Sequence, residues 1–230
     1  MPSNAPSRLA VIIPARNEAS RIGAVLSTLP TRLAGFDELR VFVVDDGSTD
    51  RTAQVARSHG ARLLRHRVNL GKGGALRTGC EAAVRAGCDV LVFMDADGQH
   101  RAEDLPSLLL PIQAGRADLV VGARRFSREM PGTMRLGNWG LSSLFGVLFG
   151  QRLRDTQSGM RAMRAEIYPL LRWEASSYAV ETEMLVRAAR TKVRVQEVPI
   201  KTVYLDAYKG TTITDGLKIF GSMLRWRARR

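Results

Sequence analysis

Cysteine is scarce in this chain, so we do not expect a disulfide framework. Only two cysteines, Cys80 and Cys88, occur among 230 residues. Their spacing is unlike that of metal-binding pairs, and both lie in or beside a predicted helix. We interpret them as reduced structural thiols of a cytosolic protein. A chain of this length buries an ample core without cross-links.

Long apolar runs are also missing, which argues against a signal peptide and a membrane span. The apolar residues 11–13 are too few for a signal core and lie inside a strand-like pattern. A bilayer span needs about 20 predominantly apolar residues. The nearest candidate, residues 136–153, is interrupted by glycines, polar residues and Arg152. We therefore expect any membrane contact to be peripheral.

Acidic residues are too few to balance the basic ones. The 22 Asp and Glu residues stand against 35 Lys and Arg residues, which gives a formal net charge of +13. The excess lies mainly between Arg124 and Arg164 and at the C-terminus. Such an excess suits nucleic acid, anionic lipid or phosphorylated small molecules as partners.

Apolar runs alternate with helix-period segments in the first half of the chain. The runs cover residues 9–13, 41–44, 62–64, 90–94 and 119–121, and the clearest helices cover residues 51–59, 73–86 and 102–113. This alternation predicts an α/β fold with a mostly parallel sheet flanked by helices. After Gly122 the rhythm breaks. There we expect helices at 139–149 and 182–190, a strand at 193–198 and a basic C-terminal helix.

Two carboxylates and an amide follow one predicted buried strand. Asp95, Asp97 and Gln99 come directly after the apolar run 90–94. Open α/β sheets bind ligands beyond the carboxyl ends of such strands. Mg²⁺ takes oxygen ligands, usually one or two carboxylates together with substrate phosphates. The pattern predicts a divalent metal site, and a turn with a helix N-cap is the alternative.

The loop after the first strand should meet the Asp95 loop at the same edge of the sheet. It contains Pro14, Ala15, Asn17 and Glu18. Pro14 ends the strand because it cannot donate a ladder hydrogen bond, while Asn17 and Glu18 supply polar contacts. The alternative for Asn17 is a cap on the next helix.

The loop after the second strand should reach the same edge. Asp45 and Asp46 can accept hydrogen bonds from a ribose or a base, as acidic residues at strand ends do in dinucleotide folds. Ser48 and Asp50 are interpreted as caps of the helix that follows.

A glycine-rich segment, residues 69–74, precedes another predicted helix and contains Lys72. Such a segment brings backbone amides and positive charge towards a phosphate. It is not a Walker loop, because Lys72 is followed by Gly73 rather than by a hydroxyl residue. A plain turn before the helix is the alternative.

Taken together, these loops resemble glycosyltransferase family two. The Pro-x-x-Asn-Glu loop at 14–18, the Asp-Asp-Gly-Ser-x-Asp loop at 45–50 and the Asp-x-Asp motif at 95–97 occur in the order of that family. The resemblance implies a nucleotide-sugar-binding fold of GT-A type and a divalent metal, Mg²⁺ or Mn²⁺.

A narrower resemblance is carried by residues 69–73, 95–99 and 155–161, which look like the dolichyl- and polyprenyl-phosphate hexose synthases. It implies inverting transfer of a hexose from a nucleotide sugar, GDP-mannose or UDP-glucose, to a polyprenyl or dolichyl phosphate.

The resemblance also implies roles for individual residues. Asp95, Asp97 and Gln99 would hold the metal. The donor would contact Pro14, Ala15, Asn17, Glu18, Asp45, Asp46, Lys72, Asp95 and Ala96. Catalysis would depend on Asp97, Arg124 and Arg135, and the acceptor phosphate would bind Arg135, Ser158 and Arg161.

Each of these later residues also has a structural interpretation. For the arginines it is a solvated basic surface, and for Ser158 and Arg161 it is a helix-to-strand turn. Glu181 and Glu183 precede a predicted helix, where carboxylates favour the positive end of the dipole. We interpret these two as structural first and acceptor-related second.

The C-terminus departs from the family pattern, since many relatives carry transmembrane helices there and this chain has a basic helix. We expect residues 1–205 to form a catalytic domain and residues 206–230 a basic amphipathic helix, peripheral at the inner, cytoplasmic face of a membrane. Apolar residues at 139–149 and 217–224 suit the headgroup boundary, with core packing as the alternative. Trp226, among arginines, is predicted to be an interfacial anchor.

Two other functions remain open at this point. A soluble family-two glycosyltransferase with a carbohydrate or protein acceptor would need a carboxylate base to deprotonate a hydroxyl. A basic nucleic-acid-binding module accounts for the net charge, but it leaves the carboxylates at the strand ends unexplained. We therefore expect no nucleic-acid partner.

Overall fold

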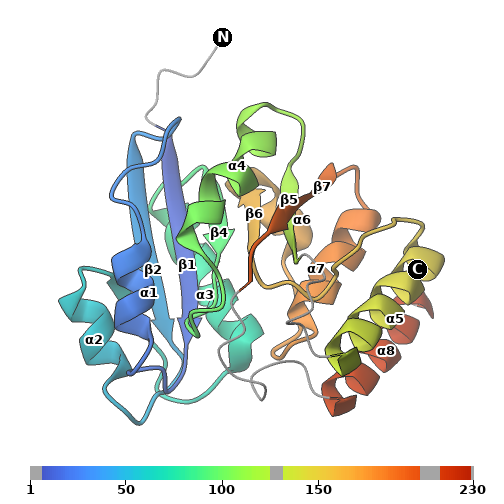
Figure 1. The fold of residues 1–230 in the computed structure, drawn as a ribbon, viewed down its shortest axis with the longest axis horizontal. Helices are drawn as coiled ribbons and strands as arrows, with labels where there is room; N and C mark the ends of the chain where they lie inside the picture. The colour runs from blue at the N-terminus through green and yellow to red at the C-terminus, as the bar shows by residue number, and fades with distance from the viewer. Residues whose placement is uncertain (1–6, 125–131, 203–212, 229–230) are drawn as a thin grey trace.

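The computed structural model describes residues 7–124, 132–202 and 213–228, which form one sheet flanked by helices (Figure 1). The seven strands lie in the order β3-β2-β1-β4-β6-β5-β7. They are β1 (Arg8–Ala15), β2 (Glu38–Asp45), β3 (Arg62–Arg65), β4 (Val90–Phe93), β5 (Leu119–Arg124), β6 (Arg161–Arg164) and β7 (Val195–Ile200). The helices are α1 (Ile22–Thr28), α2 (Thr52–Ser58), α3 (Gly71–Arg85), α4 (Leu105–Gln113), α5 (Gly132–Phe149), α6 (Tyr168–Leu171), α7 (Val180–Ala189) and α8 (Ile213–Ala228).

The predicted α/β class with a mostly parallel sheet is confirmed. β1 pairs in parallel with β2 and β4, β2 with β3, and β5 with β7. Only β6 is antiparallel to its neighbours, β4 and β5. Its four residues, Arg-Ala-Met-Arg, begin and end with a charged residue, so the local pattern did not predict a strand. Pairing on both sides makes this segment a strand.

Side chains of the central strands alternate between two cores, as the pleat requires. Leu9, Val11 and Ile13 of β1 face the core covered by α1 and α4, whereas Ala10 and Ile12 face the core covered by α3, α6 and α7. The sheet is thus buried on both faces, which explains the continuous apolar runs in the sequence.

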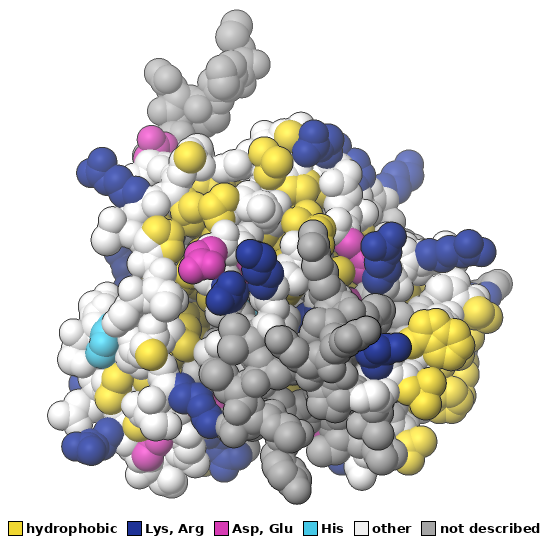
Figure 2. Space-filling view, viewed as in Figure 1, with side chains coloured by type: hydrophobic (Ala, Val, Ile, Leu, Met, Phe, Trp, Pro, Cys, Tyr) yellow, Lys and Arg dark blue, Asp and Glu magenta, His cyan; other side chains and the backbone are white. Residues whose placement is uncertain are grey.

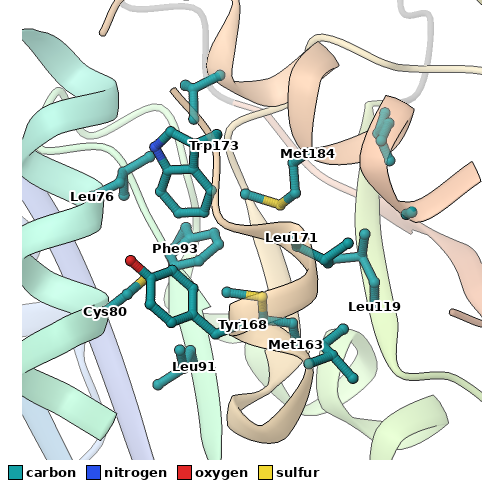
Figure 3. Close-up of a cluster of buried hydrophobic side chains, with 14 of the residues drawn as sticks. Leu76, Cys80, Leu91, Phe93, Leu119, Met163, Tyr168, Leu171, Trp173 and Met184 are labelled. Carbon is teal, nitrogen blue, oxygen red and sulfur yellow. The ribbon is translucent and has the colours of Figure 1, made fainter. Parts of the chain in front are cut away.

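Trp173 is 1% exposed and packs in the second core (Figure 3). Its ring meets Phe93 and Tyr168 edge-on, at centroid distances of 6.1 Å and 5.8 Å. Its indole Nε1 donates a hydrogen bond of 2.8 Å to the carbonyl of Gly73, at the beginning of α3. Through this hydrogen bond, the second core holds the glycine-rich segment at the beginning of α3.

α5 and α8 pack against each other, at the right of Figure 1. Each helix has a buried and an exposed side: Phe145 and Met223 are fully buried, whereas Trp139 and Leu217 are 63% and 68% exposed. The predicted core packing is therefore confirmed for one side of each helix, and contact of the exposed side with a headgroup layer stays a prediction. Trp226 is half-buried against the core, and its predicted role as an interfacial anchor stays a prediction. No helix in the described part of the chain is long and apolar enough to span a bilayer.

Candidate active site

A cavity of about 420 Å³ lies at the carboxyl ends of β1, β2, β4 and β5. Because these ends share one edge of the sheet, the predicted loops meet there. The early loops contribute Pro14, Ala15, Arg16, Glu18, Asp46, Lys72, Asp95, Ala96, Asp97, Gln99 and His100. Later segments contribute Arg124, Gln157, Ser158, Gly159, Ser177, Tyr178, Glu181 and Thr202.

Lys72 bridges two carboxylates in this cavity. Its Nζ lies 2.6 Å from Asp95 Oδ1 and 2.8 Å from Glu181 Oε1. Burial opposes the charged ammonium, but the two carboxylates outweigh burial and raise the pKa of Lys72. Burial likewise opposes ionisation of Asp95, yet the charges of Lys72 and His100 hold the pKa of Asp95 below its usual range. The Lys72 ammonium and the Asp95 carboxylate therefore both favour their charged forms near neutral pH.

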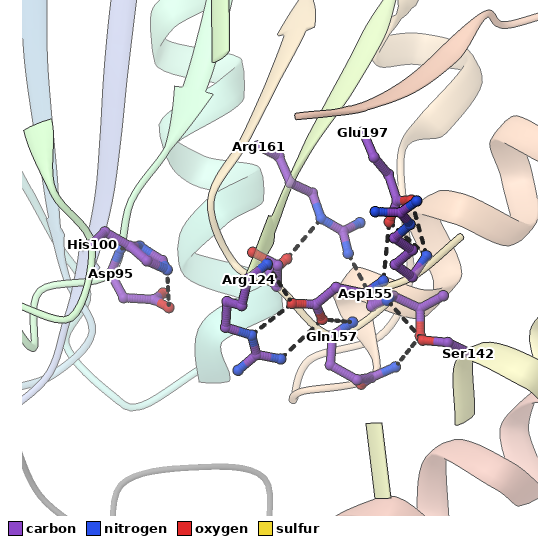
Figure 4. Close-up of polar contacts among 11 residues, drawn as sticks. Asp95, His100, Arg124, Ser142, Asp155, Gln157, Arg161 and Glu197 are labelled. Atoms are coloured by element: carbon purple, nitrogen blue, oxygen red, sulfur yellow. Dashed lines mark hydrogen bonds and ion pairs between the residues drawn. The ribbon is translucent and has the colours of Figure 1, made fainter. Parts of the chain in front are cut away.

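His100 packs against the other side of Asp95 (Figure 4). Its Nδ1 accepts a 3.0 Å hydrogen bond from the backbone N–H of Asp95, and its Nε2 lies 3.8 Å from Asp95 Oδ2. The ring thereby fixes the orientation of the Asp95 loop.

Asp97 lies on the same loop and pairs with no basic side chain among the described residues. Its Oδ1 accepts a 3.0 Å hydrogen bond from the backbone N–H of Gln99. Burial, and then repulsion from Asp95, raise the pKa of Asp97. A cation between these two carboxylates would relieve that repulsion.

The donor set suits a metal that binds together with a substrate. The described residues contain no group of three His, Cys, Asp or Glu side chains arranged to hold a metal ion. Mg²⁺, however, commonly uses only one or two carboxylates when substrate phosphates complete its shell. Asp95 and Asp97, with the Gln99 amide beside them, fit that case.

Asp46 holds the turn that carries Lys72. Its two carboxylate oxygens accept hydrogen bonds of 2.8 Å from the backbone N–H groups of Leu70 and Gly71. His66 Nδ1 lies 2.8 Å from Asp46 Oδ1. Asp46 lines the cavity, and its carboxylate also holds this turn; its contact with a ribose or a base stays a prediction.

The glycines beside Lys72 allow another segment to approach closely. Gly71 has φ +80°, and a Cβ on Gly73 would collide with the carbonyl oxygen of Ala175. Gly73 N–H donates a 2.9 Å hydrogen bond to the carbonyl of Ser176. The backbone at the beginning of α3 is thus held in place by these contacts.

The Arg124 side chain reaches the cavity from the end of β5 and pairs with Asp155 (Figure 4). Asp155 is fully buried, and its own backbone N–H donates to Glu197 Oε1 of β7 at 3.0 Å. The carboxylate of Glu197 also accepts hydrogen bonds from Arg154 N–H. β7 therefore fixes the loop that positions Arg124.

Two residues that line the cavity each keep a buried oxygen without a hydrogen-bond partner among the described residues. These oxygens are Ser158 Oγ and Glu181 Oε2. Buried polar atoms are usually paired, so both oxygens suit a bound ligand: Glu181 Oε2 can accept a hydrogen bond from it, and the Ser158 hydroxyl can donate or accept one. Gly159 lies next to them, and a Cβ there would be 2.5 Å from Asp95 Oδ2 and 2.9 Å from Lys72 Nζ.

Asn17 and Asp45 lie outside the cavity lining. Asn17 joins the loop after β1 to the loop after β2, and Asp45 makes a hydrogen bond within the loop after β2. Asn17 Oδ1 accepts the backbone N–H of Thr49, so Asn17 does not cap a helix. Asp45 Oδ1 accepts the backbone N–H of Ser48, and its Oδ2 pairs with Arg65. These contacts give both residues a structural role, and their predicted contact with the donor stays a prediction.

The two cap interpretations for the second loop have different outcomes. Asp50 Oδ1 accepts the N–H of Thr52, the first residue of α2, but the N-cap position itself is Arg51 and has no side-chain cap. Ser48 Oγ instead accepts the N–H of Asn17, which joins the loop after β1 to the loop after β2.

Arg161 and Arg135 also lie outside the cavity lining. Arg161 is 1% exposed, and its guanidinium donates to backbone carbonyls of Thr156, Ser158 and Glu181. These contacts give it a structural role, and its predicted contact with an acceptor stays a prediction. Arg135 is exposed on α5 and is open to a partner outside the cavity.

Glu181 lines the cavity, although the sequence analysis ranked a structural role first for it. Glu183, two residues on, has the predicted structural role: its carboxylate accepts the N–H groups of Glu174 and Ala175 and pairs with Arg187. Nothing local distinguishes the two glutamates, because both begin the same helix. Only the tertiary contact with Lys72 sets Glu181 apart.

The chain is similar to known glycosyltransferases. Residues 10–170 match the model of Glycosyl transferase family 2. A UDP-N-acetylglucosamine–dolichyl-phosphate N-acetylglucosaminyltransferase of Methanococcus voltae is 33% identical over 93% of this chain and 94% of its own length. An undecaprenyl-phosphate mannosyltransferase of Micrococcus luteus is 34% identical over 85% and 84%. A dolichyl-phosphate hexose transferase of Haloferax volcanii is 36% identical over 84% and 81%.

Solved structures share the fold at lower sequence identity. Glucosyl-3-phosphoglycerate synthase of Mycobacterium tuberculosis, in complex with Mn²⁺, UDP-glucose and phosphoglyceric acid, aligns with a TM-score of 0.77 at 23% identity. The alignment covers 97% of this chain and 80% of that one. The same enzyme with Mg²⁺ and UDP aligns with a TM-score of 0.75. The predicted GT-A-like fold is thereby confirmed.

Proposed function

The chain belongs to glycosyltransferase family 2, and from that premise we propose that it transfers a hexose from a nucleotide sugar to a polyprenyl or dolichyl phosphate, with inversion. One observation carries the proposal: the carboxylates suited to a metal, Asp95 and Asp97, line the same cavity as two cations. The cations are Lys72 and Arg124. A nucleoside diphosphate sugar needs this combination, since its diphosphate binds a metal and positive side chains together.

The acceptor class is supported by the relatives, whose names specify dolichyl or undecaprenyl phosphate. The sugars in those names differ: N-acetylglucosamine, mannose and an unspecified hexose. We therefore propose the donor as a class, the nucleoside diphosphate sugars, with GDP-mannose and UDP-glucose as the first two to test.

In the proposed reaction, the chain positions two anions against each other. A bound divalent metal, held by Asp95, Asp97 and Gln99, would neutralise the charge that develops on the leaving diphosphate. Arg124 is held rigidly by Asp155 and supplies a planar guanidinium at the cavity, suited to a phosphate group. Lys72 adds a second positive charge at the same place.

The acceptor phosphate requires little activation. A phosphate monoester has its second pKa near ~6, so it is largely a dianion at neutral pH and attacks without a general base. Ser158, with its unpartnered Oγ, is proposed to donate a hydrogen bond to this phosphate. Arg135, exposed at the beginning of α5, is proposed to attract it from outside.

A lipid acceptor requires a surface that meets the membrane, and we propose the exposed side of α5 and α8. Large apolar side chains are exposed there, and Figure 2 shows apolar side chains beside basic ones at the right edge of the molecule. The exposed apolar residues are Leu136, Trp139, Val147, Leu217, Phe220 and Leu224. The exposed basic residues of the two helices include Arg135, Lys218, Arg225 and Arg227. Such a face suits peripheral binding at an anionic headgroup layer.

The experiment is a transfer assay with purified protein and vesicles that contain polyprenyl phosphate. Labelled GDP-mannose, UDP-glucose and UDP-N-acetylglucosamine are supplied separately, each with and without a chelator. We expect one donor to label the lipid and the chelator to stop the reaction. Transfer to a soluble sugar or peptide instead of the lipid would favour a hydroxyl acceptor, and salt-sensitive oligonucleotide binding without any transfer would refute the proposal.

A further inference from the structure

We infer that Lys72 is a built-in counter-cation of Asp95, which competes with the divalent metal until a diphosphate draws Lys72 away. The inference rests on the proposed function and concerns how the same site loads its ligands. The Lys72 ammonium contacts Asp95 Oδ1 at 2.6 Å and Glu181 Oε1 at 2.8 Å. It thereby occupies one of the two carboxylate oxygens that Asp95 could offer to a metal.

The Lys72 ammonium and a divalent metal compete for Asp95 because both are cations that bind its carboxylate. A carboxylate with little access to water is stabilised by a paired cation, and Lys72 supplies that cation for Glu181, whose side chain is 6% exposed, and for Asp95, whose side chain is 26% exposed. A divalent cation at Asp95 would stand beside the ammonium, and two like charges at such short range repel each other. Metal binding therefore requires Lys72 to leave Asp95 Oδ1.

The surroundings allow the side chain to leave but keep the backbone fixed. Gly71 and Gly73 pack against the 175–176 backbone, and Asp46 holds the turn before them. The Lys72 stem retains its rotatable bonds and, through Glu181, a second carboxylate to hold it. Gly159 has no side chain that could separate the Lys72–Asp95 pair from the cavity.

A diphosphate is the ligand that completes the exchange. It carries negative charge for Lys72 to bind, and its oxygens also complete the shell of the metal. Binding of the metal and of the nucleotide should therefore favour each other, and by linkage the effect is reciprocal.

The test measures binding of Mn²⁺ from the electron paramagnetic resonance signal of the free ion, with and without UDP or GDP. In wild type, we expect the nucleotide to tighten Mn²⁺ binding. Lys72→Met removes the competing cation, so Mn²⁺ alone should bind at least about fivefold tighter, the lower end of ordinary coupling between two sites. Nucleotide binding should weaken in this variant, and the coupling between the two ligands should shrink.

Glu181→Gln is the matched control. It removes a carboxylate from the same cluster but leaves Lys72 on Asp95, so Mn²⁺ alone should not bind more tightly. Lys72→Gln repeats the test with a neutral polar side chain, and circular dichroism verifies that each variant is folded. Folded Lys72 variants that bind Mn²⁺ no more tightly than wild type would overturn the inference. Failure of wild type to bind either Mn²⁺ or a nucleotide would instead overturn the proposed function.

Discussion

Arg124 and Asp155 form a two-point ion pair that joins the end of β5 to the loop before β6. Arg124 Nε donates to Asp155 Oδ2 at 2.6 Å and Nη2 donates to Oδ1 at 2.9 Å. The backbone N–H of Arg124 donates to the same carboxylate at 3.1 Å. Such paired contacts fix the plane of a guanidinium. The direction in which Arg124 meets the cavity therefore depends on a residue outside it.

Asp155→Asn should impair both stability and transfer. Removal of one partner of a buried ion pair costs about 3–5 kcal/mol of unfolding free energy. Because Arg124 also loses its fixed position, we expect kcat/KM for the donor to fall about 10²-fold, the effect of a displacement near 1 Å. Urea unfolding and initial-rate kinetics measure the two effects. Asp118→Asn, at the exposed Arg194 pair, is the control and should leave kinetics unchanged.

The stability cost of Asp155→Asn should depend on pH. Burial raises the pKa of Asp155, but the hydrogen bonds and charge of Arg124 outweigh burial and hold the pKa below its usual value. In wild type, the Asp155 carboxylate therefore contributes its full stabilisation of the fold above about pH 4, the usual range of Asp. It is lost as the pH falls through the lowered pKa. The difference in unfolding free energy between wild type and variant should narrow in acid, and a constant difference would contradict this account.

Asp97→Asn should stop transfer without weakening the fold. Loss of a metal ligand removes several kcal/mol of transition-state stabilisation, which corresponds to about 10³-fold in kcat. The raised pKa of Asp97, caused by burial and then by Asp95, shows that its charge is unfavourable in the folded protein. The melting temperature should therefore stay the same or rise. Normal turnover by this variant would remove the metal-assisted mechanism.

Gly159→Ala tests whether the backbone at Gly159 must pack closely against the Lys72–Asp95 ion pair. The new Cβ would lie 2.5 Å from Asp95 Oδ2, so the carboxylate must shift. We expect transfer to fall about 10²-fold. Gly140→Ala on α5 is the matched control, since a Cβ there meets nothing within 4 Å. It should keep full activity and stabilise the helix by about 1 kcal/mol.

Trp139→Glu tests the proposed membrane surface. A large apolar side chain is worth about 1.5–3 kcal/mol when buried, so vesicle affinity should fall about tenfold or more. Sedimentation with anionic vesicles measures the change. Leu110→Glu is the control, because Leu110 is 55% exposed on α4, away from α5 and α8. Equal losses in both variants would show that the effect is not specific to α5.

Much of the fold could be predicted because the sheet is buried on both faces and its strands are continuous apolar runs. Asp95 and Asp97 could be placed in the cavity because the carboxyl ends of parallel strands meet at one edge. β6 escaped prediction because a strand of four residues with charged ends has no local signature.

Roles that depend on tertiary contacts could not be predicted. Glu181 and Glu183 have the same local setting, yet one meets Lys72 in the cavity and the other holds a loop. Asp46 and Arg161 carry the right chemistry for ligand binding, but the backbone of the chain itself takes up their hydrogen bonds. Sequence spacing shows which groups reach the edge of the sheet, whereas packing decides which of them face the cavity.

The most direct test of the proposed site is anomalous diffraction from crystals grown with Mn²⁺ and a nucleoside diphosphate, UDP or GDP. We predict a manganese peak between the carboxylates of Asp95 and Asp97, in contact with the diphosphate. Arg124 should face the same diphosphate. A manganese peak elsewhere, with a nucleotide bound outside this cavity, would contradict the account.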